Sequence, residues 1–251
     1  MVPATMVSRF ASEKTLSTHD QIARALGSEI LRGVHAPGAN LPPEPDLLAR
    51  FAISRTVLRE VIKTLAAKGF VVSRTRVGTW VQDPVHWNFF DADVLAWKVS
   101  LGMDQRFRRD LAEMRRAVEP KAASLAANRR TREDLAELRR CIAVMAERGH
   151  SRRSFAEADL NFHLAVGAAS QNPLMRSVAA VIEAALIASF SLSSPVDQPQ
   201  LQADTVIAHA AIVDAIEAGN GEAAALAMLA VIDDGFERIE AEIAADPAAT
   251  P

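Results

Sequence analysis

Cysteine and long apolar runs are both scarce in this sequence. Cys141 is the only cysteine among 251 residues, so the chain cannot build a disulfide framework or a cluster of thiolate metal ligands. No run approaches the ~18 apolar residues that a membrane span requires, and residues 1–17 contain no apolar core typical of a secretory signal. These absences predict an intracellular, cytoplasmic protein whose residues 1–17 form a flexible arm.

Positive charge is also limited, except in one short stretch. The chain has a net charge of −3, whereas residues 50–76 hold seven basic residues and a single acid, Glu60. Through Asp83 the net charge is +4, so the rest of the chain carries −7. This asymmetry favours a polyanionic partner for the first part only, and a length of 251 residues favours two domains.

The first part has the element order of a winged helix-turn-helix domain. Thr18 and Gln21 fit a capping box at the start of a helix, a short second helix is expected to end at Phe51, and Ser54 can cap a third. Residues 70–73 and 78–81 predict the two strands of a hairpin. We therefore expect a winged helix-turn-helix domain over residues 18–83.

Helical patterns dominate the chain after residue 81, where strand signals disappear. Helices are predicted at about 89–100, 104–128, 131–148, 151–170, 173–190, 200–218 and 221–244. Residues 84–102 are expected to form a connecting helix, residues 103–246 an all-α antiparallel helical bundle, and residues 247–251 a tail. The predicted fold class is therefore mainly α.

Basic side chains gather on the third helix, which would be the recognition helix of such a domain. Side chains near the N-terminus of that helix reach base edges in the major groove, and an arginine fork can make two hydrogen bonds to guanine. Arg55 and Arg59 are therefore predicted to contact bases or adjacent phosphates, with Ser54 and Thr56 on phosphates. The remaining predicted DNA-binding residues, which neutralise phosphates or belong to the wing, are Arg50, Lys63, Arg74, Arg76 and Gly78. The alternative is a basic face that is merely solvated.

This combination of elements resembles the GntR family of bacterial transcription regulators. The residues that match the family pattern are Leu41, Pro42, Glu44, Leu47, Ser54, Arg55, Arg59, Glu60, Leu65, Gly69, Arg74, Gly78, Thr79 and Val81. The resemblance implies a homodimer that binds an operator with two half-sites. Pro45 replaces an arginine that touches DNA in many members, and Arg76 replaces a wing glycine. One inherited DNA contact is therefore expected to be missing, and Arg76 is expected to add a phosphate contact.

Three residues of the second part have the spacing of a metal site. Asp159 and His163 are four residues apart, so a helix places them on one face, about 5 to 6 Å apart at Cβ. His209 lies among apolar residues on a later helix, on a face expected to point into the bundle. Together they predict a three-ligand site with positions open for water or a ligand oxygen. Taken alone, each histidine is more typical of a hydrogen-bonded core residue.

The second part also resembles the FCD ligand-binding domain of the FadR subfamily. Members of that subfamily bind a divalent metal through an Asp-x-x-x-His pair and one histidine from each of two later helices. Asp159, His163 and His209 match this pattern, but the last ligand position holds Val231. The resemblance implies a divalent cation such as zinc, whose coordination shell a bound acid would complete.

A narrower resemblance concerns the residues that join the two parts. The run WNFFDADVLAWKVSLG from Trp87 and the later MRRAVEP are similar to the branch of the family that contains the galactonate-operon repressor. This similarity implies a sugar acid, such as an aldonate, as effector. Arg115 would then pair with the effector carboxylate and Thr205 with a hydroxyl group. The competing interpretation of Arg115 is an intrahelical pair with Glu119.

These features together favour transcription regulation over catalysis. We expect a homodimeric DNA-binding repressor that leaves its operator when a small carboxylate, such as a sugar acid, binds near the metal. A rival is a metalloenzyme that activates water at Asp159, His163 and His209, but the sequence contains no nucleophile motif and no general base at a suitable spacing. A third possibility is a regulator whose helical bundle serves dimerisation alone.

Overall fold

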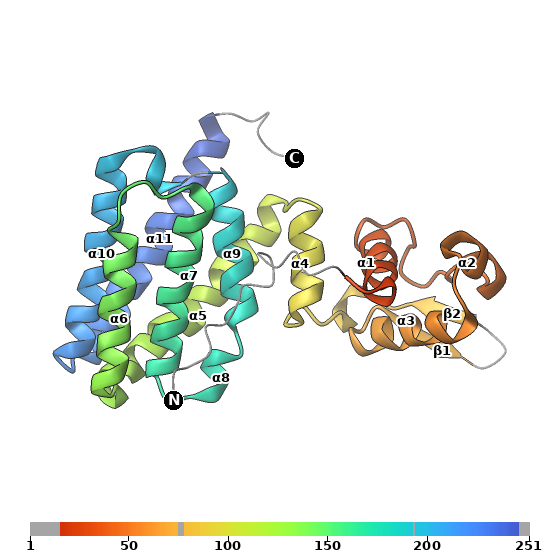
Figure 1. The fold of residues 1–251 in the computed structure, drawn as a ribbon, viewed down its shortest axis with the longest axis horizontal. Coiled ribbons are helices and arrows are strands. Elements are labelled where there is room, and N and C mark those ends of the chain that lie inside the picture. Colours follow the sequence, from red (N-terminus) through yellow and green to blue (C-terminus); the bar gives the residue numbers. More distant parts are fainter. Residues whose placement is uncertain (1–15, 75–77, 193, 246–251) are drawn as a thin grey trace. The chain divides into compact units, whose positions relative to one another are not determined.

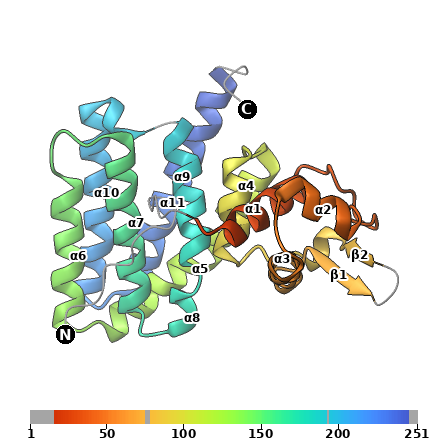
Figure 2. The same ribbon diagram turned by 45° about the vertical axis from the view of Figure 1, so that its right-hand side comes forward.

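The computed structural model describes residues 16–74, 78–192 and 194–245, and the chain divides into two compact units, Met1–Gly102 and Met103–Pro251. Both units are built mainly from helices, as predicted, and the strands of the described residues form one hairpin in the first unit (Figures 1 and 2). In these ranges no helix combines the length and the apolar composition that a membrane span needs.

The first unit has the element order of a winged helix-turn-helix domain followed by one more helix. Its elements are α1 (Thr18–Leu31), α2 (Glu44–Phe51), α3 (Arg55–Ala67), β1 (Val71–Arg74), β2 (Gly78–Val81), the short 3₁₀ helix η1 (Pro84–His86) and α4 (Ala92–Ser100).

The core of the first unit forms where the apolar faces of α1 and α3 meet. Leu26 and Ile30 of α1 are one turn apart, as are Val61 and Leu65 of α3, and all four side chains are at most 1 % exposed. Phe70 adds a fully buried ring to the same cluster. Since one face of α3 is used for packing, its opposite face is left for polar residues.

The start of α1 differs from the sequence-based expectation by one residue. Ser17, not Thr18, has the extended backbone of a cap, and its Oγ accepts a hydrogen bond from the backbone N–H of Asp20 at 3.2 Å. The side chain of Gln21 donates to the carbonyl oxygen of Leu16 at 2.9 Å. The predicted capping box at Thr18 is therefore wrong, because an equally good hydroxyl cap lies one position earlier.

The hairpin has the register of a short two-stranded wing. β1 and β2 pair antiparallel from Val71 opposite Val81 to Arg74 opposite Gly78. Gly78 opens β2 with a φ of +114°, a backbone conformation that side chains with a Cβ rarely adopt. A glycine is therefore favoured at the start of β2.

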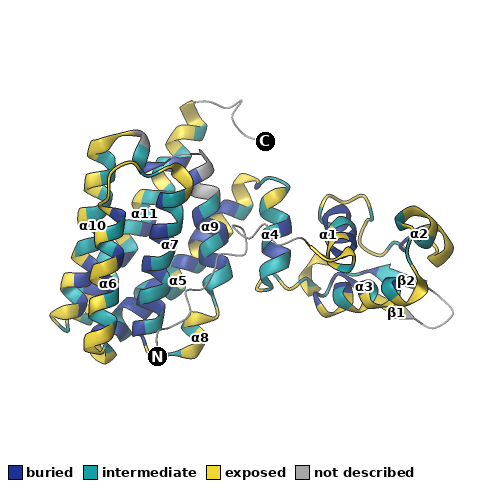
Figure 3. Ribbon diagram, viewed as in Figure 1, coloured by how far each residue is buried: buried dark blue, intermediate teal, exposed yellow. Residues whose placement is uncertain are grey.

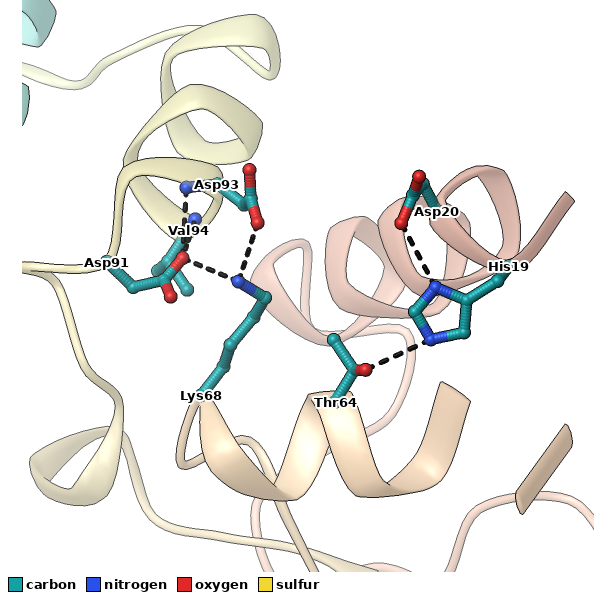
Figure 4. Close-up of polar contacts among 7 residues, drawn as sticks. All are labelled: His19, Asp20, Thr64, Lys68, Asp91, Asp93 and Val94. Atoms are coloured by element: carbon teal, nitrogen blue, oxygen red, sulfur yellow. Dashed lines mark hydrogen bonds and ion pairs between the residues drawn. The ribbon is translucent and has the colours of Figure 1, made fainter. Parts of the chain in front are cut away.

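Lys68, the C-cap of α3, ties that helix to the start of α4 (Figure 4). The lysine is buried, and its Nζ lies 2.7 Å from Asp91 Oδ1 and 2.8 Å from Asp93 Oδ2. Asp91 also caps α4 by accepting hydrogen bonds from the backbone N–H groups of Asp93 and Val94. Because Val94 lies in the core of the first unit, the connecting segment expected over 84–102 packs against that unit along α4.

The second unit is a bundle of helices in the described residues. Its elements are α5 (Gln105–Arg129), α6 (Arg132–Met145), α7 (Arg152–Ala169), α8 (Pro173–Arg176), α9 (Ala179–Leu192), the 3₁₀ helix η2 (Pro195–Asp197), α10 (Pro199–Glu217) and α11 (Gly221–Ala245).

Helix α5 is central to the bundle because it packs against α7, α9, α10 and α11. Buried residues run along α5, α7 and α9 in Figure 3. Ala123 and Ala126 of α5 are fully buried, and their small side chains allow close approach of larger neighbours such as Phe155 and Phe162 of α7. The alanine-rich composition of this part is therefore a packing feature.

The helix predicted over residues 173–190 is two helices. α8 ends at Arg176 and α9 begins at Ala179. The hydroxyl of Ser177 donates to the carbonyl oxygen of Pro173 at 3.1 Å and so competes with the backbone at the end of the first turn. No glycine or proline follows Pro173 in this segment, which is why the sequence pattern did not reveal the break.

A glycine after α3 provides a test of the first unit. Gly69 has a φ of +81°, and an added Cβ would lie 2.0 Å from the carbonyl oxygen of His86. We expect Gly69→Ala to lower the free energy of unfolding by about 3 kcal/mol or more, since backbone strain adds to a backbone clash. The measurement is urea unfolding followed by tryptophan fluorescence, because all three tryptophans lie in this unit.

Gly38→Ala is the matched control for this experiment. Its φ is +80°, but nothing lies within 4 Å of the added Cβ. The backbone strain alone should lower the free energy of unfolding by about 1 to 2 kcal/mol. An equal decrease in the free energy of unfolding in Gly69→Ala and Gly38→Ala would contradict the packing described around Gly69.

An ion pair between α1 and α2 predicts a pH dependence. Both terminal nitrogens of Arg50 donate to the carboxylate of Glu29, which is 11 % exposed. The hydrogen bonds from Arg50 hold the pKa of Glu29 below its usual value of 4.5. A lowered folded-state pKa adds stability above the unfolded pKa, and that stability is lost as the pH falls toward the folded value.

We therefore expect Glu29→Gln to destabilise the first unit by about 1 to 3 kcal/mol at pH 7. The difference from the unsubstituted protein should shrink progressively below pH 4.5. Glu60→Gln removes an exposed pair with Lys63 and should leave the free energy of unfolding almost unchanged. A Glu29→Gln effect that stays constant from pH 7 to pH 3 would show that its cause is not the ion pair.

Candidate functional site

The N-terminal turn of α3 presents polar side chains to solvent. Ser54 Oγ caps the helix by accepting a hydrogen bond from the backbone N–H of Val57 at 3.3 Å, as predicted. Arg55, Thr56 and Arg59 follow and are exposed, and the side chain of Arg55 is 80 % exposed. Two exposed arginines one turn apart at a helix N-terminus have the placement that contact with bases in the major groove requires.

Acids hold some of these basic side chains in the free protein. Arg55 Nε lies 3.4 Å from Glu44 Oε1, and Lys63 Nζ lies 2.7 Å from Glu60 Oε1. All four side chains are more than half exposed, so the pairs contribute little to stability. Arg59 forms no ion pair within the part of the chain that the structure describes. These cations can therefore exchange a carboxylate for a phosphate at small cost.

Arg50 differs from the other predicted phosphate contacts because it has a structural partner. Its pair with Glu29 joins α2 to α1, and its guanidinium also lies 4.7 Å from the centre of the Phe51 ring. The side chain is 47 % exposed. Part of the guanidinium therefore faces solvent while the rest stabilises the helix-turn-helix unit.

A groove lies beside α3 and the hairpin in the first unit. Its lining includes residues predicted to bind DNA and two hydroxyl-bearing residues of the wing, namely Arg59, Lys63, Gly78, Ser73 and Thr79. The hydroxyl oxygens of Ser73 and Thr79 lie 3.2 Å apart across the two strands. The groove thus offers cations and hydroxyl groups on one surface.

The sequence departs from the family pattern at Pro45 and Arg76. Pro45 occupies the first turn of α2, where the missing N–H has no intrahelical acceptor. It supports the helix but provides no cationic side chain. Arg76 lies outside the described residues, and the side chain of Arg74 is likewise not described.

The second unit brings the three predicted metal ligands together. Asp159 and His163 of α7 and His209 of α10 are at most 3 % exposed, and one ligand atom from each lies within 4.8 Å of the others. Asp159 Oδ1 is 2.8 Å from His209 Nε2, and Asp159 Oδ2 is 3.8 Å from His163 Nε2. A carboxylate and two imidazoles therefore converge inside the bundle.

The orientation of His209 leaves a lone pair directed at Asp159. His209 Nδ1 lies 2.7 Å from the carbonyl oxygen of Thr205, so Nδ1 carries the proton and Nε2 does not in the neutral ring. Asp159 Oδ1 and His209 Nε2 face each other, and neither has a hydrogen-bond partner among the described residues. Two lone pairs at 2.8 Å repel unless a positive charge lies against both. A divalent cation fits this requirement.

His163 is oriented by a carboxylate from another helix. Arg115 Nη2 of α5 lies 3.2 Å from His163 Nε2, and a guanidinium can only donate, so the ring proton resides on Nδ1. That nitrogen faces Glu119 Oε2 at 2.5 Å. A carboxylate behind a histidine is a common way to fix a metal ligand. Glu119 therefore places the lone pair of His163 on Nε2, which faces both Arg115 Nη2 and, at 3.8 Å, Asp159 Oδ2.

Both buried carboxyl groups of the site are ionised at neutral pH. Burial raises the pKa of Asp159, but the charges that His209 and His163 can carry, with that of Arg115, lower it to about 2. Burial also raises the pKa of Glu119. The charge of Arg115 and the contacts of Glu119 with His163 outweigh this effect and lower that pKa to about 2. A cation that binds here would therefore displace protons from the histidines, where they carry them, and not from Asp159.

Arg115 forms the intrahelical pair that was the competing interpretation of this residue. It is buried, and its Nε donates to Glu119 Oε1 at 2.5 Å. No acceptor among the described residues takes a hydrogen bond from its Nη1. The predicted contact with an effector carboxylate is therefore restricted to this remaining nitrogen, or requires Arg115 to leave His163.

Thr205 and Val231 complete the predicted site positions. The hydroxyl of Thr205 donates to the carbonyl oxygen of Leu201 at 2.8 Å, and its own carbonyl accepts from His209. Thr205 is half-buried, so its hydroxyl oxygen has room for a further hydrogen bond. Val231 is half-buried against the core and offers no ligand atom.

Two arginines of this unit were not predicted from the sequence. Arg108 precedes Arg115 by seven residues, and Arg238 follows Val231 by seven residues. Seven residues are two helical turns, so this spacing was the signal that could have placed them on the same faces. Burial lowers the pKa of Arg238, whereas the nearby charge of Asp159 raises it. Arg238 therefore contributes positive charge beside the cluster.

Comparison with known proteins places both units. Residues 18–81 match the model of bacterial regulatory proteins of the gntR family, and residues 110–234 match that of the FCD domain. The chain is 34 % identical over 226 residues to the galactonate operon transcriptional repressor of Escherichia coli strain K12, which covers 90 % of this chain and 98 % of that protein. YieP, an uncharacterized HTH-type transcriptional regulator of the same strain, is 35 % identical over 229 residues. The alignment covers 89 % of this chain and 95 % of YieP.

A solved structure agrees with these matches at the level of the fold. The structure is titled for Lar, which controls expression of the Listeria monocytogenes agr system, and it aligns with a TM-score of 0.61 at 19 % identity over 91 % of this chain and 99 % of that chain. The relatives are regulators of transcription, so the expectation of a regulator and not an enzyme is confirmed. The chain belongs to the GntR family of bacterial transcription regulators, and an FCD domain follows its DNA-binding domain.

Proposed function

We propose that this chain is a homodimeric repressor that leaves its operator when a small carboxylate, a sugar acid or a related acid, binds beside a divalent metal. The observation that carries the proposal is the buried cluster of Asp159, His163 and His209, in which a carboxylate oxygen and an imidazole lone pair face each other. In this proposal residues 18–83 bind DNA, residues 84–102 connect, and residues 103–246 bind the effector and dimerise. The protein would act in the cytoplasm.

The donor set suits zinc or a similar divalent cation. Asp159, His163 and His209 would hold the ion, and Glu119 would keep His163 in the required orientation. Because Val231 supplies no fourth ligand, coordination positions remain for oxygen atoms from a ligand. The bound ion would supply a positive charge that attracts and polarises a carboxylate.

A sugar acid matches the polar groups around this cluster. The relative that is 34 % identical is named for repression of a galactonate operon, and galactonate is a sugar acid. In our proposal Arg115 Nη1 donates to the effector carboxylate and the Thr205 hydroxyl binds a hydroxyl of the sugar chain. Two contacts support this assignment: Arg115 Nη2 lies 3.2 Å from His163 Nε2, and the backbone carbonyl of Thr205 accepts from His209 Nδ1.

The DNA-binding surface follows from the exposed face of α3 and the wing. We assign base contacts to Arg55 and Arg59 and phosphate contacts to Ser54 and Thr56. The other residues assigned to the phosphate backbone or the wing are Arg50, Lys63, Arg74, Arg76 and Gly78. A two-fold symmetric dimer would place two copies of α3 in major grooves of a palindromic operator, about 34 Å apart for half-sites separated by one turn.

Effector binding can release DNA only if it favours an arrangement of the dimer that binds DNA poorly. Within the first unit, Lys68 ties the end of α3 to Asp91 and Asp93 at the start of α4. A displacement of α4 would therefore be transmitted directly to α3. We propose that this helix pair is the output of the effector-binding domain.

The base-contact assignment can be tested with two substitutions on α3. Arg59→Ala should weaken binding to the cognate operator about ten- to a hundredfold and change binding to random duplex much less. Lys63→Ala should weaken both and reduce the slope of log affinity against log salt by about 1. Fluorescence anisotropy with an operator selected from a random duplex pool measures both effects. Small, equal effects of the two variants would overturn the assignment.

The metal proposal can be tested by removing one ligand. Asp159→Asn should lower the affinity of metal-stripped protein for Zn²⁺ about a hundredfold or more, because it removes the charged ligand. It should also abolish operator release by a sugar acid while leaving operator binding intact. Calorimetry with a competing chelator measures the zinc affinity. Fluorescence anisotropy of labelled operator measures operator binding and release.

Asp214→Asn is the matched control, since Asp214 is an exposed acid on the same helix as His209. It should change neither zinc affinity nor operator release. Unchanged zinc affinity in Asp159→Asn would show that the cluster is a hydrogen-bonded core. Absence of heat with zinc and with every sugar acid in the unsubstituted protein would favour a bundle that only dimerises.

A further inference from the structure

Arg108 of α5 is a buried arginine without an acidic partner. Only 6 % of this residue is exposed to solvent. Nη1 donates to the carbonyl oxygen of Met103, whereas Nε and Nη2 are buried and have no hydrogen-bond partner among the described residues. No ion pair in the described part of the chain includes this guanidinium. Arg108 therefore holds an uncompensated positive charge inside the second unit.

An uncompensated buried charge is strongly unfavourable for folding. Arginine does not relieve the cost by losing its proton, because its pKa is too high. The desolvation penalty is offset only when an anion and further hydrogen bonds are supplied. Arg115 on the same helix shows the compensated case, since Glu119 neutralises it. Arg108 lacks such a group, so the fold retains a cost that a bound anion would remove.

Arg108 and Arg115 line one cavity of the second unit. They are two helical turns apart, which places them on the same face of α5. The rest of the lining is apolar and includes Leu111, Ile232 and Phe236. Apolar walls exclude water and therefore strengthen the attraction between a guanidinium and an anion. The lining of the cavity thus includes two guanidinium groups whose residues are two helical turns apart on α5.

The cavity is small in the state described here. Its volume is about 30 Å³, which is room for roughly one water molecule. A carboxylate attached to a carbon chain is larger, so its entry requires movement of the wall. Gly235 and Phe236 of α11 form part of that wall. An anion at Arg108 would therefore be accommodated by a shift between α5 and α11.

We propose that Arg108 forms a second anion subsite of the effector pocket and that the effector is consequently a dianion. One carboxylate binds beside Arg115 and the metal position, and a second negative group at the other end of the molecule binds Arg108. This inference rests on the proposed function, because it assumes that the pocket beside Arg115 receives the effector. It narrows the effector class from small carboxylates in general to acids with two anionic ends.

Galactonate and galactarate provide a direct test, because galactarate has a carboxylate at each end and galactonate has one. Calorimetry with the zinc-loaded full-length protein should show that galactarate binds at least about tenfold more tightly. Arg108→Met should bring the two affinities within about threefold of each other by weakening galactarate alone. Arg108→Lys, which keeps the charge, should retain part of the preference. Arg115→Met should weaken both acids.

Protein stability separates a binding role from a structural one. Removing an unpaired buried charge should leave the melting temperature of unliganded Arg108→Met unchanged or higher. The control is Arg109→Met, which alters the neighbouring exposed arginine and should change neither affinity nor stability. A lower melting temperature in Arg108→Met, with the preference for galactarate unchanged, would mark Arg108 as structural and overturn the proposal.

The outcomes also separate this inference from the proposed function. If the unsubstituted protein binds both acids equally, or if Arg108→Met weakens both equally, the second anion subsite is refuted. The proposed function stands in that case, provided that Arg115→Met abolishes binding. If neither acid binds to the zinc-loaded protein, both the dianion subsite and the sugar-acid effector are refuted.

Discussion

The site in the helical unit depends on the placement of an ionised carboxylate against an imidazole lone pair. Asp159 and His209 face each other in a buried environment, and the proton of His209 is directed to the carbonyl of Thr205. Either a proton on His209 Nε2 or a bound metal cation would satisfy both atoms. Glu119 orients His163 toward the same point. The surrounding contacts therefore bring a carboxylate and two imidazoles together at a point that could hold a cation.

The DNA-binding unit uses charge in the opposite way. Arg55 and its partner Glu44 are more than half exposed, and water screens their attraction. Such a pair keeps the cation available for a stronger partner, because exchange of a carboxylate for a phosphate changes little else. The pair of Arg50 with the shielded Glu29 instead holds two helices together. The shielded partner thus gives Arg50 a structural role that Arg55 does not have.

The sequence was sufficient for features that depend on local pattern. Helical periodicity, the cap at Ser54 and the Asp159–His163 spacing were predicted because neighbouring residues determine them. The role of Glu119 could not be predicted with the same certainty, since its contact with His163 joins residues 44 positions apart on different helices. The break between α8 and α9 was missed because a serine hydroxyl, and not a glycine or proline, ends the first turn. Side-chain competition of this kind has no strong sequence signature.

Helix α5 combines tight packing with buried charge, and this combination explains how a ligand could act at a distance. Its alanines form part of the core, yet Arg108, Arg115 and Glu119 lie along it and are also buried. Their spacings of seven and four residues place them on one side of the helix. In our proposal, a ligand that compensates Arg108 would have to enlarge the small cavity that α5, α9 and α11 line. α5 begins at Gln105, shortly after the boundary between the two units. In our proposal, a shift of this helix would therefore act through the covalent link to α4, which Lys68 holds against the DNA-binding helix.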